Sequence, residues 1–277
     1  MKPKREVTNP SLIQAVVFDW AGTVVDFGSL APIDGFCQLF ERNQVPITQA
    51  EARIPMGTEK RAHIAQLLAM PRIRDAWLSA YQTPPSEADI DRLYEAFIPI
   101  QIEAIERHAQ LIPGTRETFD YLSHRKIPVG GNTGYSREMI TGLVTSAAEA
   151  GYRPQSIVAA SDVPRGRPHP DMLHKNLSDL AAESPYRCIK VDDTLPGIKE
   201  GLNAGCWTVA VALTGNEIGL DLADWNRLPD NEKELRREQA YRRLHDGGAH
   251  YVIDSVAELP GIVEAIERRL KVGERPQ

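Results

Sequence analysis

The sequence predicts an α/β fold, with a doubly wound parallel sheet as its core and an all-helical cap domain inserted into that core. Three observations lead to this prediction: short apolar runs recur along the chain, helical patterns separate them, and one long segment is helical throughout. The chain has 277 residues, of which 42% are hydrophobic and 25% charged. This composition is ordinary for a globular protein, and the length suits one sizeable core with a subordinate domain.

Six short runs of apolar and β-branched residues are typical of the buried strands of a parallel sheet. They are AVVFD (15–19), KIPVGGNTG (126–134), SIVAAS (156–161), CIKVDD (188–193), TVAVALTG (208–215) and HYVID (250–254). Helical patterns such as GTRETFDYLSHR, REMITGLVTSAAEA and PGIKEGLNAG lie between them. Alternation of strands and helices predicts βαβ units and therefore a Rossmann-like, doubly wound core.

The segment from residue 27 to residue 110 interrupts this alternation. It contains IDGFCQLFERN, TEKRAHIAQLLAM, RDAWLSAY and SEADIDRLYEAFIPIQIEAIERHAQ, which all have a helical period, and no comparable strand run. We therefore expect residues 27–110 to form a helical cap domain, inserted into a core made of residues 1–26 and 111–277. A cap attached to an α/β core can close over a site.

Charge and composition argue against several partners. The net charge is −6 without a basic run, so we expect no nucleic-acid partner. No apolar run approaches the roughly 20 residues that span a bilayer, so we expect no membrane partner. The N-terminus, MKPKREVTNPSL, lacks the apolar segment of a secretion signal. Cys37, Cys188 and Cys206 form no CxxC pair, which favours free thiols and a cytoplasmic location.

Polar side chains stand at the predicted carboxyl ends of successive strands, where open α/β sheets bind ligands. They are Asp19 after the first strand, Asn132 and Thr133 at the second, Arg167 in the loop after the third, and Asp192 and Asp193 at the fourth. Each alone has an ordinary explanation as a turn former, a helix cap or a solvated loop residue. Together they predict a phosphoryl site with Mg²⁺, because the metal prefers hard oxygen ligands while a hydroxyl and a cation bind phosphoryl oxygens.

The pattern FDxxGTxxD at 18–26, the later threonine, the basic residue and the acidic pair before a helix resemble the haloacid dehalogenase superfamily. The resemblance covers nearly the whole chain, with residues 27–110 in the place of the inserted cap. It implies that Asp19 is a nucleophile that takes up the phosphoryl group as an aspartyl-phosphate and also binds Mg²⁺. It further implies that Asp193 is the second acidic ligand and that Thr133 and Arg167 hold the phosphoryl oxygens.

Ala21 departs from the pattern of most phosphatases in this superfamily. They carry a second aspartate there, two residues after the nucleophile, as the general acid that protonates the leaving oxygen. An alanine supplies only its backbone carbonyl, which by resemblance binds Mg²⁺. Hydrolysis of an ordinary phosphate ester should therefore be poor, and another device must assist the leaving group.

The cap sequence EARIPMGTEKRAHIAQLLAM (51–70) offers such a device. In a helix, Lys60 shares one face with Ile64, Leu67 and Leu68. Desolvation on that face lowers the pKa of a lysine and leaves more free amine to attack a carbonyl. The alternative is a lysine that extends its ammonium into water.

Several short sequence motifs narrow the resemblance to the phosphonoacetaldehyde hydrolases, also called phosphonatases. These motifs are Met56-Gly57, Lys60 with His63, the opening FDWAGT, TGYSREM (133–139) and GRPHPDM (166–172). In that family a cap lysine forms a Schiff base with the substrate aldehyde, and the matching residue is Lys60. A protonated imine accepts the electrons of the broken carbon–phosphorus bond, so the leaving group departs as a neutral enamine and needs no acid at position 21.

The resemblance implies a reaction and further roles. Phosphonoacetaldehyde would be cleaved to acetaldehyde and phosphate in the degradation of 2-aminoethylphosphonate, by a Mg²⁺-dependent homodimer. His63 would carry a proton, Met56 and Gly57 would shape the pocket, and Tyr135 would lie near the substrate.

One position departs from the superfamily, which often has another aspartate four residues after the one matched by Asp193. This chain has Gly197 there. Two explanations remain open: Asp192 supplies the missing charge, or water completes the shell of the metal, since Mg²⁺ usually keeps several waters.

Three other functions fit the sequence less well. A capped sugar-phosphate phosphatase or phosphomutase would need the acid that Ala21 replaces. A non-catalytic phosphate-binding scaffold would have no need of Asp19, Thr133, Arg167 and Asp193 together. Neither GxGxxG nor GxxxxGK[ST] follows a predicted strand, which argues against a nucleotide-binding protein.

Overall fold

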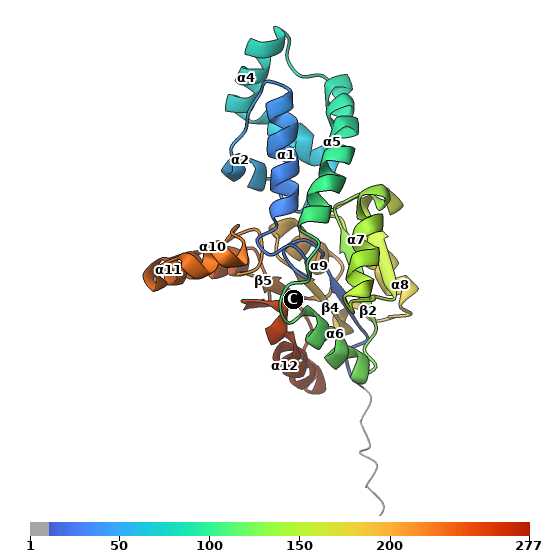
Figure 1. Cartoon of the computed structure of the whole chain (residues 1–277). Coiled ribbons are helices and arrows are strands. Elements are labelled where there is room, and N and C mark those ends of the chain that lie inside the picture. Colours follow the sequence, from blue (N-terminus) through green and yellow to red (C-terminus); the bar gives the residue numbers. More distant parts are fainter. Residues whose placement is uncertain (1–10) are drawn as a thin grey trace, which may run out of the picture.

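A computed structural model describes residues 11–277 (Figure 1). Residues 1–10, most of the segment considered for a secretion signal, lie outside this range. Six parallel strands form one sheet in the order β3-β2-β1-β4-β5-β6. They are β1 (Ala15–Phe18), β2 (Val129–Thr133), β3 (Ser156–Ala159), β4 (Cys188–Asp192), β5 (Trp207–Val211) and β6 (Tyr251–Ile253). The predicted doubly wound parallel sheet is confirmed.

The first strand lies in the middle of the sheet. Val16 pairs with Val129 of β2 on one side and with Ile189 of β4 on the other. The strand order changes direction at this point, so the carboxyl ends of β2, β1 and β4 meet beside one crevice. Such a crevice is where open α/β sheets bind ligands.

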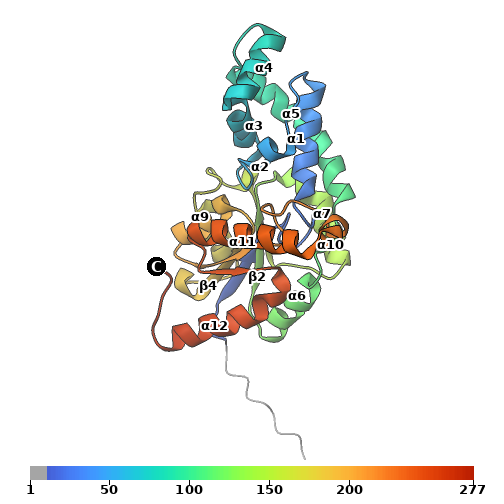
Figure 2. The same cartoon turned by 90° about the vertical axis from the view of Figure 1, so that its left-hand side faces the viewer.

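Helices cover both faces of the sheet. Val16 and Phe18 of β1 contribute to one apolar cluster, and Ala15 and Val17 to another, as the alternation of side chains along a strand requires. The helices of the core are α6 (Thr115–His124), α7 (Arg137–Glu149), α8 (Asp171–Asp179), α9 (Leu195–Asn203), α10 (Leu222–Arg227), α11 (Asp230–Asp246) and α12 (Leu259–Lys271). Figure 2 faces α10 and α11, and α11 contacts the edge strand β6.

The first five of the six helices between β1 and β2 stand above the sheet in Figure 1. They are α1 (Leu30–Arg42), α2 (Gln49–Arg53), α3 (Lys60–Ala69), α4 (Pro71–Tyr81) and α5 (Glu87–Arg107). The long helices α1 and α5 pack together through Phe36 and Phe97, whose rings stack with centroids 4.4 Å apart. This helical unit therefore has an apolar core of its own.

Two further observations bear on the expectations above. Cys37, Cys188 and Cys206 are free thiols. Across residues 11–277, the structure contains no helix that combines the length and the apolar character needed to cross a membrane.

Candidate active site

The polar residues that end the strands lie together at the carboxyl edge of the sheet. Carboxylate oxygens of Asp19, Asp192 and Asp193 lie within 4.8 Å of one another, and all three residues are buried. Thr133, at the end of β2, and Arg167 line the same pocket as Asp19 and Asp193. The sheet thus brings residues from four separate segments of the sequence to one point.

The donor set fits a divalent cation. Burial, followed by repulsion from Asp192, raises the pKa of Asp19 to about 6. Burial, followed by repulsion from Asp19 and Asp192, raises the pKa of Asp193 well above its usual range. A bound divalent cation would relieve this repulsion, and carboxylate oxygens are the ligands that Mg²⁺ prefers. Ala21 lines the same pocket.

Asp192 differs from the other two carboxylates because two cations already neutralise it. One of its oxygens lies 3.0 Å from Lys190 Nζ and 3.3 Å from Arg167 Nη1. Its other oxygen accepts hydrogen bonds from the backbone N–H of Thr194 at 3.0 Å and from its hydroxyl at 2.7 Å. Burial opposes its ionisation, but Arg167 and Lys190 outweigh burial and lower the pKa of Asp192.

Asp192 also explains the glycine at position 197. A Cβ on Gly197 would lie 2.0 Å from the carboxylate carbon of Asp192, far inside van der Waals contact. The Asp192 carboxylate therefore occupies the space that an aspartate side chain at 197 would need. This packing accounts for the glycine at 197; because Arg167 and Lys190 already pair with Asp192, both explanations of the metal shell stay predictions.

Arg167 lies at the centre of a buried polar network. Its Nη2 lies 2.7 Å from Asp19 Oδ1 and donates to Asn132 Oδ1, also at 2.7 Å. Its Nε donates to Glu200 Oε2 at 3.0 Å. Glu200 also accepts from Asn132 Nδ2 at 3.1 Å and lies 3.4 Å from Lys190 Nζ. The guanidinium is thus fixed in orientation beside the predicted nucleophile.

Lys190 and Glu200 were not anticipated by the sequence reasoning. Both side chains are fully buried, Lys190 on β4 and Glu200 on α9. The available signal was Lys190 itself, a lone cation inside the apolar run CIKVDD, since buried lysines almost always have a partner. The sequence does not show that the partner is Glu200, ten positions further on and on another element.

Lys60 is the first residue of α3, and the carboxylate of Glu59 caps this helix. Only 4% of Lys60 is exposed, and its Nζ lies 4.8 Å from the ring centroid of Tyr135 and 5.5 Å from that of Phe36. Burial, partly opposed by the charge of Asp19, lowers the pKa of Lys60 to about 8. The alternative of an ammonium extended into water is wrong, and the predicted desolvation is confirmed.

His63 lies one turn further along α3 and does not line the pocket. Its ring stacks on Phe36 at 3.8 Å, and its Nε2 lies 2.9 Å from the carbonyl oxygen of Ala52. Burial, followed by repulsion from Lys60, lowers the pKa of His63 well below its usual range. His63 is therefore a neutral ring packed behind the lysine.

The pocket itself is small, with a volume of about 20 Å³, room for about one water molecule. Nine of the predicted residues line it: Asp19, Ala21, Met56, Gly57, Lys60, Thr133, Tyr135, Arg167 and Asp193. The cap and the core approach closely at two glycines. A Cβ on Gly57 would lie 2.3 Å from Thr194 Oγ1, and one on Gly134 would lie 2.7 Å from the carbonyl oxygen of Thr58.

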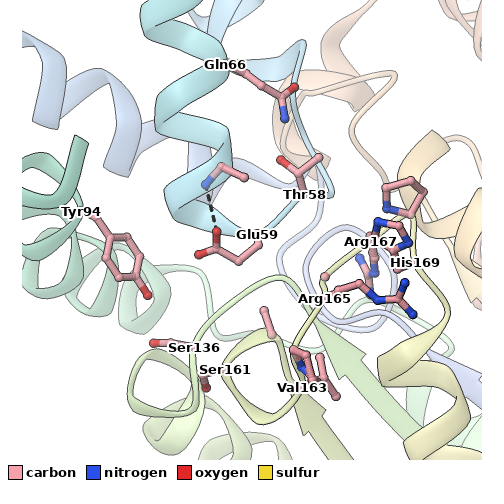
Figure 3. A pocket seen from close by; sticks show the side chains of 15 residues that line it. Thr58, Glu59, Gln66, Tyr94, Ser136, Ser161, Val163, Arg165, Arg167 and His169 are labelled. Carbon is pink, nitrogen blue, oxygen red and sulfur yellow. Dashed lines mark hydrogen bonds between the residues drawn. The ribbon is translucent and has the colours of Figure 1, made fainter. Parts of the chain in front are cut away.

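A wider cavity of about 550 Å³ lies beside this pocket and shares Arg167 with it (Figure 3). It runs between the helical unit, which contributes Glu59 and Tyr94, and the core loop that carries Arg165 and His169. None of the three clustered carboxylates lines it. The wider cavity is therefore an approach to the site, and the smaller pocket holds the chemical groups.

Comparison with known proteins identifies the family. Residues 13–205 match the haloacid dehalogenase-like hydrolase family. The chain is 56% identical over 264 residues to a phosphonoacetaldehyde hydrolase of Hahella chejuensis, covering 95% of this chain and 90% of that protein. It belongs to the phosphonoacetaldehyde hydrolase family. A phosphonoacetaldehyde hydrolase of Paraburkholderia phytofirmans is 47% identical, over 95% of this chain and 99% of its own length.

Solved structures agree with membership of the phosphonoacetaldehyde hydrolase family. The crystal structure of a phosphonoacetaldehyde hydrolase-like protein from Oleispira antarctica has a TM-score of 0.95 and 50% identity, covering 97% of both chains. A β-phosphoglucomutase from Clostridium difficile has a TM-score of 0.65 and 17% identity, covering 94% of this chain and 99% of its own. The second likeness concerns the fold alone. The resemblance drawn from the sequence is confirmed, and the chain is a hydrolase of this family.

Proposed function

We propose that this protein hydrolyses the carbon–phosphorus bond of phosphonoacetaldehyde to give acetaldehyde and phosphate. One observation carries the proposal: the buried amine of Lys60 and the carboxylate of Asp19 line one pocket, with Ala21 in the place of a general acid. An ester phosphatase requires the acid and gains nothing from the amine. The names of the relatives point to the same reaction.

Asp19, Asp193 and the backbone carbonyl of Ala21 would hold Mg²⁺, and when bound it would offset the negative charge of the nucleophile and of the phosphonate. The raised pKa values of the two carboxylates support this assignment, because their causes, burial first and mutual repulsion second, are both offset by a bound cation.

Lys60 would act first. With a pKa of about 8, about one-tenth of the side chain is a free amine at pH 7. The amine adds to the aldehyde carbon to give a carbinolamine, which takes up one proton from solvent and loses water, and this leaves a protonated imine. The ring of Tyr135 faces the nitrogen and keeps bulk water from it.

Asp19 would then attack phosphorus. The phosphonate would replace Asp19 as the partner of Arg167 Nη2, with Thr133 contacting another oxygen, which frees the Asp19 carboxylate. As the oxygen–phosphorus bond forms, the carbon–phosphorus bond breaks and its electron pair moves into the imine to give an enamine. Water hydrolyses the aspartyl-phosphate. The enamine takes a proton on carbon, and the resulting imine is hydrolysed to acetaldehyde and free Lys60.

Several expectations accompany this mechanism. We propose that residues 27–110 act as the cap over the core, because α3 carries Lys60 to the edge of the sheet. His63 as the proton carrier stays a prediction, supported only by its position behind Lys60. The homodimer and the pathway of 2-aminoethylphosphonate degradation are likewise expectations from the family, and the cytoplasmic location rests on the free thiols.

The deciding experiment uses the wild-type protein with phosphonoacetaldehyde, Mg²⁺ and borohydride, followed by peptide mass mapping. A reduced two-carbon adduct on Lys60, together with loss of activity, would support the proposal. A parallel sample without borohydride should release phosphate and carry no adduct. If wild-type protein neither forms an adduct nor releases phosphate, the result would favour a sugar-phosphate phosphatase or phosphomutase, and Ala21 would need another explanation.

A further inference from the structure

Arg53, the last residue of α2, reaches from the cap to the core. Its Nη1 donates to the carbonyl oxygens of Gly28 at 3.1 Å and Ser29 at 3.4 Å, in the segment that joins the core to α1. The same nitrogen lies 3.2 Å from Asn216 Oδ1, and Nη2 donates to the carbonyl oxygen of Gly219 at 3.0 Å. Asn216 and Gly219 belong to the loop after β5, so one side chain joins three parts of the molecule.

The loop is shaped around this guanidinium. Gly219 has a φ of +65°, a conformation that favours glycine, and a Cβ there would lie 2.6 Å from Arg53 Cζ. A larger residue would therefore be strained and would collide with the arginine. Burial lowers the pKa of Arg53, while Asp26 and Asp193 oppose this effect. The guanidinium thus occupies a prepared position near the predicted metal site.

The loop also contacts the metal site directly. The backbone N–H of Asn216 donates to Asp193 Oδ2 at 2.8 Å, while its side chain accepts from Arg53. The other carboxylate oxygen of Asp193 lies 3.4 Å from the hydroxyl of Thr23. In the described part of the chain Asp193 makes no ion pair, and the backbone N–H of Asn216 is its shortest hydrogen bond to another residue. Asn216 therefore links Arg53 to the orientation of Asp193.

We propose that Arg53 is a positioning residue that makes the geometry of Asp193 depend on closure of the cap. With α2 seated on the core, Arg53 holds the loop so that the N–H of Asn216 faces Asp193. When the cap moves away, the guanidinium leaves with it and the loop loses this restraint. The inference rests on the proposed function only in taking Asp193 as a Mg²⁺ ligand.

The test measures binding of Mg²⁺ alone by calorimetry, without substrate, in wild-type protein, Arg53→Ala and Arg53→Lys. We expect Arg53→Ala to weaken Mg²⁺ binding about tenfold, the lower range for loss of a group that supports a metal ligand. Arg53→Lys keeps the charge but has one ammonium in place of the guanidinium fork, so its loss should be smaller. Arg72→Ala is the matched control, because Arg72 pairs with Glu51 inside the helical unit and should change Mg²⁺ affinity less than twofold.

Steady-state kinetics and one further variant complete the test. Asn216→Ala removes a side-chain acceptor of Arg53 but keeps the backbone N–H that faces Asp193. We expect it to weaken Mg²⁺ binding as Arg53→Ala does, with no further loss in the double variant. It also decides the matter if Arg53→Ala does not fold. Unchanged Mg²⁺ affinity with a raised KM would show that Arg53 merely fastens the cap, and would overturn the inference. Failure of the wild-type protein to bind Mg²⁺ or release phosphate would instead contradict the proposed function.

Discussion

The Nζ atom of Lys60, on the cap helix α3, lies 4.8 Å from the ring centroid of Tyr135, which belongs to the core. The ring borders the same pocket as Asp19, and both Lys60 and Tyr135 are buried. The amine comes from the cap and the ring from the core, so contact between cap and core contributes to the desolvation of the lysine, together with Phe36 of the cap. The same packing that positions the amine also buries it and so lowers its pKa.

Replacing Lys60 by arginine should abolish cleavage of the carbon–phosphorus bond while leaving Mg²⁺ binding intact. Arginine keeps the charge but cannot form the imine. Phosphate release and borohydride trapping measure the effect. Arg61→Lys is the control, since Arg61 pairs with Glu87 and Asp91 on the surface and should keep near-normal turnover. Near-normal turnover of Lys60→Arg would show that no imine is needed.

The rate should depend on pH through Lys60. Its pKa of about 8 lies below the usual lysine value, and the deprotonated form reacts. We therefore expect kcat/KM to rise about tenfold per pH unit below pH 8 and to level off above it, since this parameter reports the free enzyme. Profiles between pH 6.5 and 9.5 test the expectation, with unfolding curves as a check on the protein. A rise that continues to pH 10 would mean that Lys60 titrates as an exposed lysine.

Binding of Mg²⁺ should release protons in acid. Asp19 has its pKa raised to about 6, so below that pH a proton competes with the metal, and affinity should fall as pH falls. Calorimetry at pH 6 in two buffers of different ionisation enthalpy would reveal the released protons. A chelator should abolish turnover, and added Mg²⁺ should restore it. Identical heats in both buffers at pH 6 would contradict the assignment of Asp19 as a ligand.

Gly197→Asp should lower stability and activity when made alone, and should be tolerated when Asp192→Gly is made with it. The new side chain would collide with the Asp192 carboxylate, and overpacking of this kind destabilises by about 1–3 kcal/mol. Adding Asp192→Gly frees the space and retains one carboxylate near Arg167 and Lys190. We expect the double variant to be more stable and more active than either single variant, as denaturant unfolding and phosphate release would show. A double variant no better than the singles would mean that the positions are not interchangeable.

Glu200→Gln should weaken substrate binding through Arg167. The change removes one of the buried ionic partners that Arg167 and Lys190 share, so KM should rise about tenfold and stability should fall by about 3 kcal/mol. Glu267→Gln is the control: Glu267 pairs with Arg125 at 2.8 Å, away from the pocket, and its loss should affect stability alone. An equal rise in KM for both variants would reduce Glu200 to a general structural role.

The strands were predictable because parallel strands buried on both faces need continuous apolar runs. Their bounds were less so: the run 126–134 yields β2 at Val129–Thr133, after Pro128, which has no N–H for a ladder. The residues at the strand ends were also predictable, since topology brings those ends together. Asp19 and Asp193 are accordingly where the motifs indicated.

The burial of Lys60 and the partners of Arg167 could not be predicted from the sequence and became visible only in the three-dimensional structure. Helical period placed Lys60 on an apolar face, yet Tyr135, which encloses it from the core side, lies far away in the sequence. Glu200 lies within a helix of the core, and nothing in its local sequence indicates that it faces Arg167. Likewise the link from Arg53 to Asp193 runs through Asn216, and nothing in the sequence around Asn216 indicates a contact with Asp193.

The two glycines where cap meets core bear on how this protein's substrate range can change. A Cβ at Gly57 or Gly134 would push against Thr194 or the backbone of Thr58, respectively, and so hold the two halves apart. The enclosed volume is therefore determined by two absent methyl groups as much as by the side chains that line it. An alanine at either position would enlarge the pocket. The larger pocket would admit longer aldehydes but would also let water reach the amine of Lys60. Selectivity for a two-carbon substrate would then depend on how closely the cap and the core pack at Gly57 and Gly134.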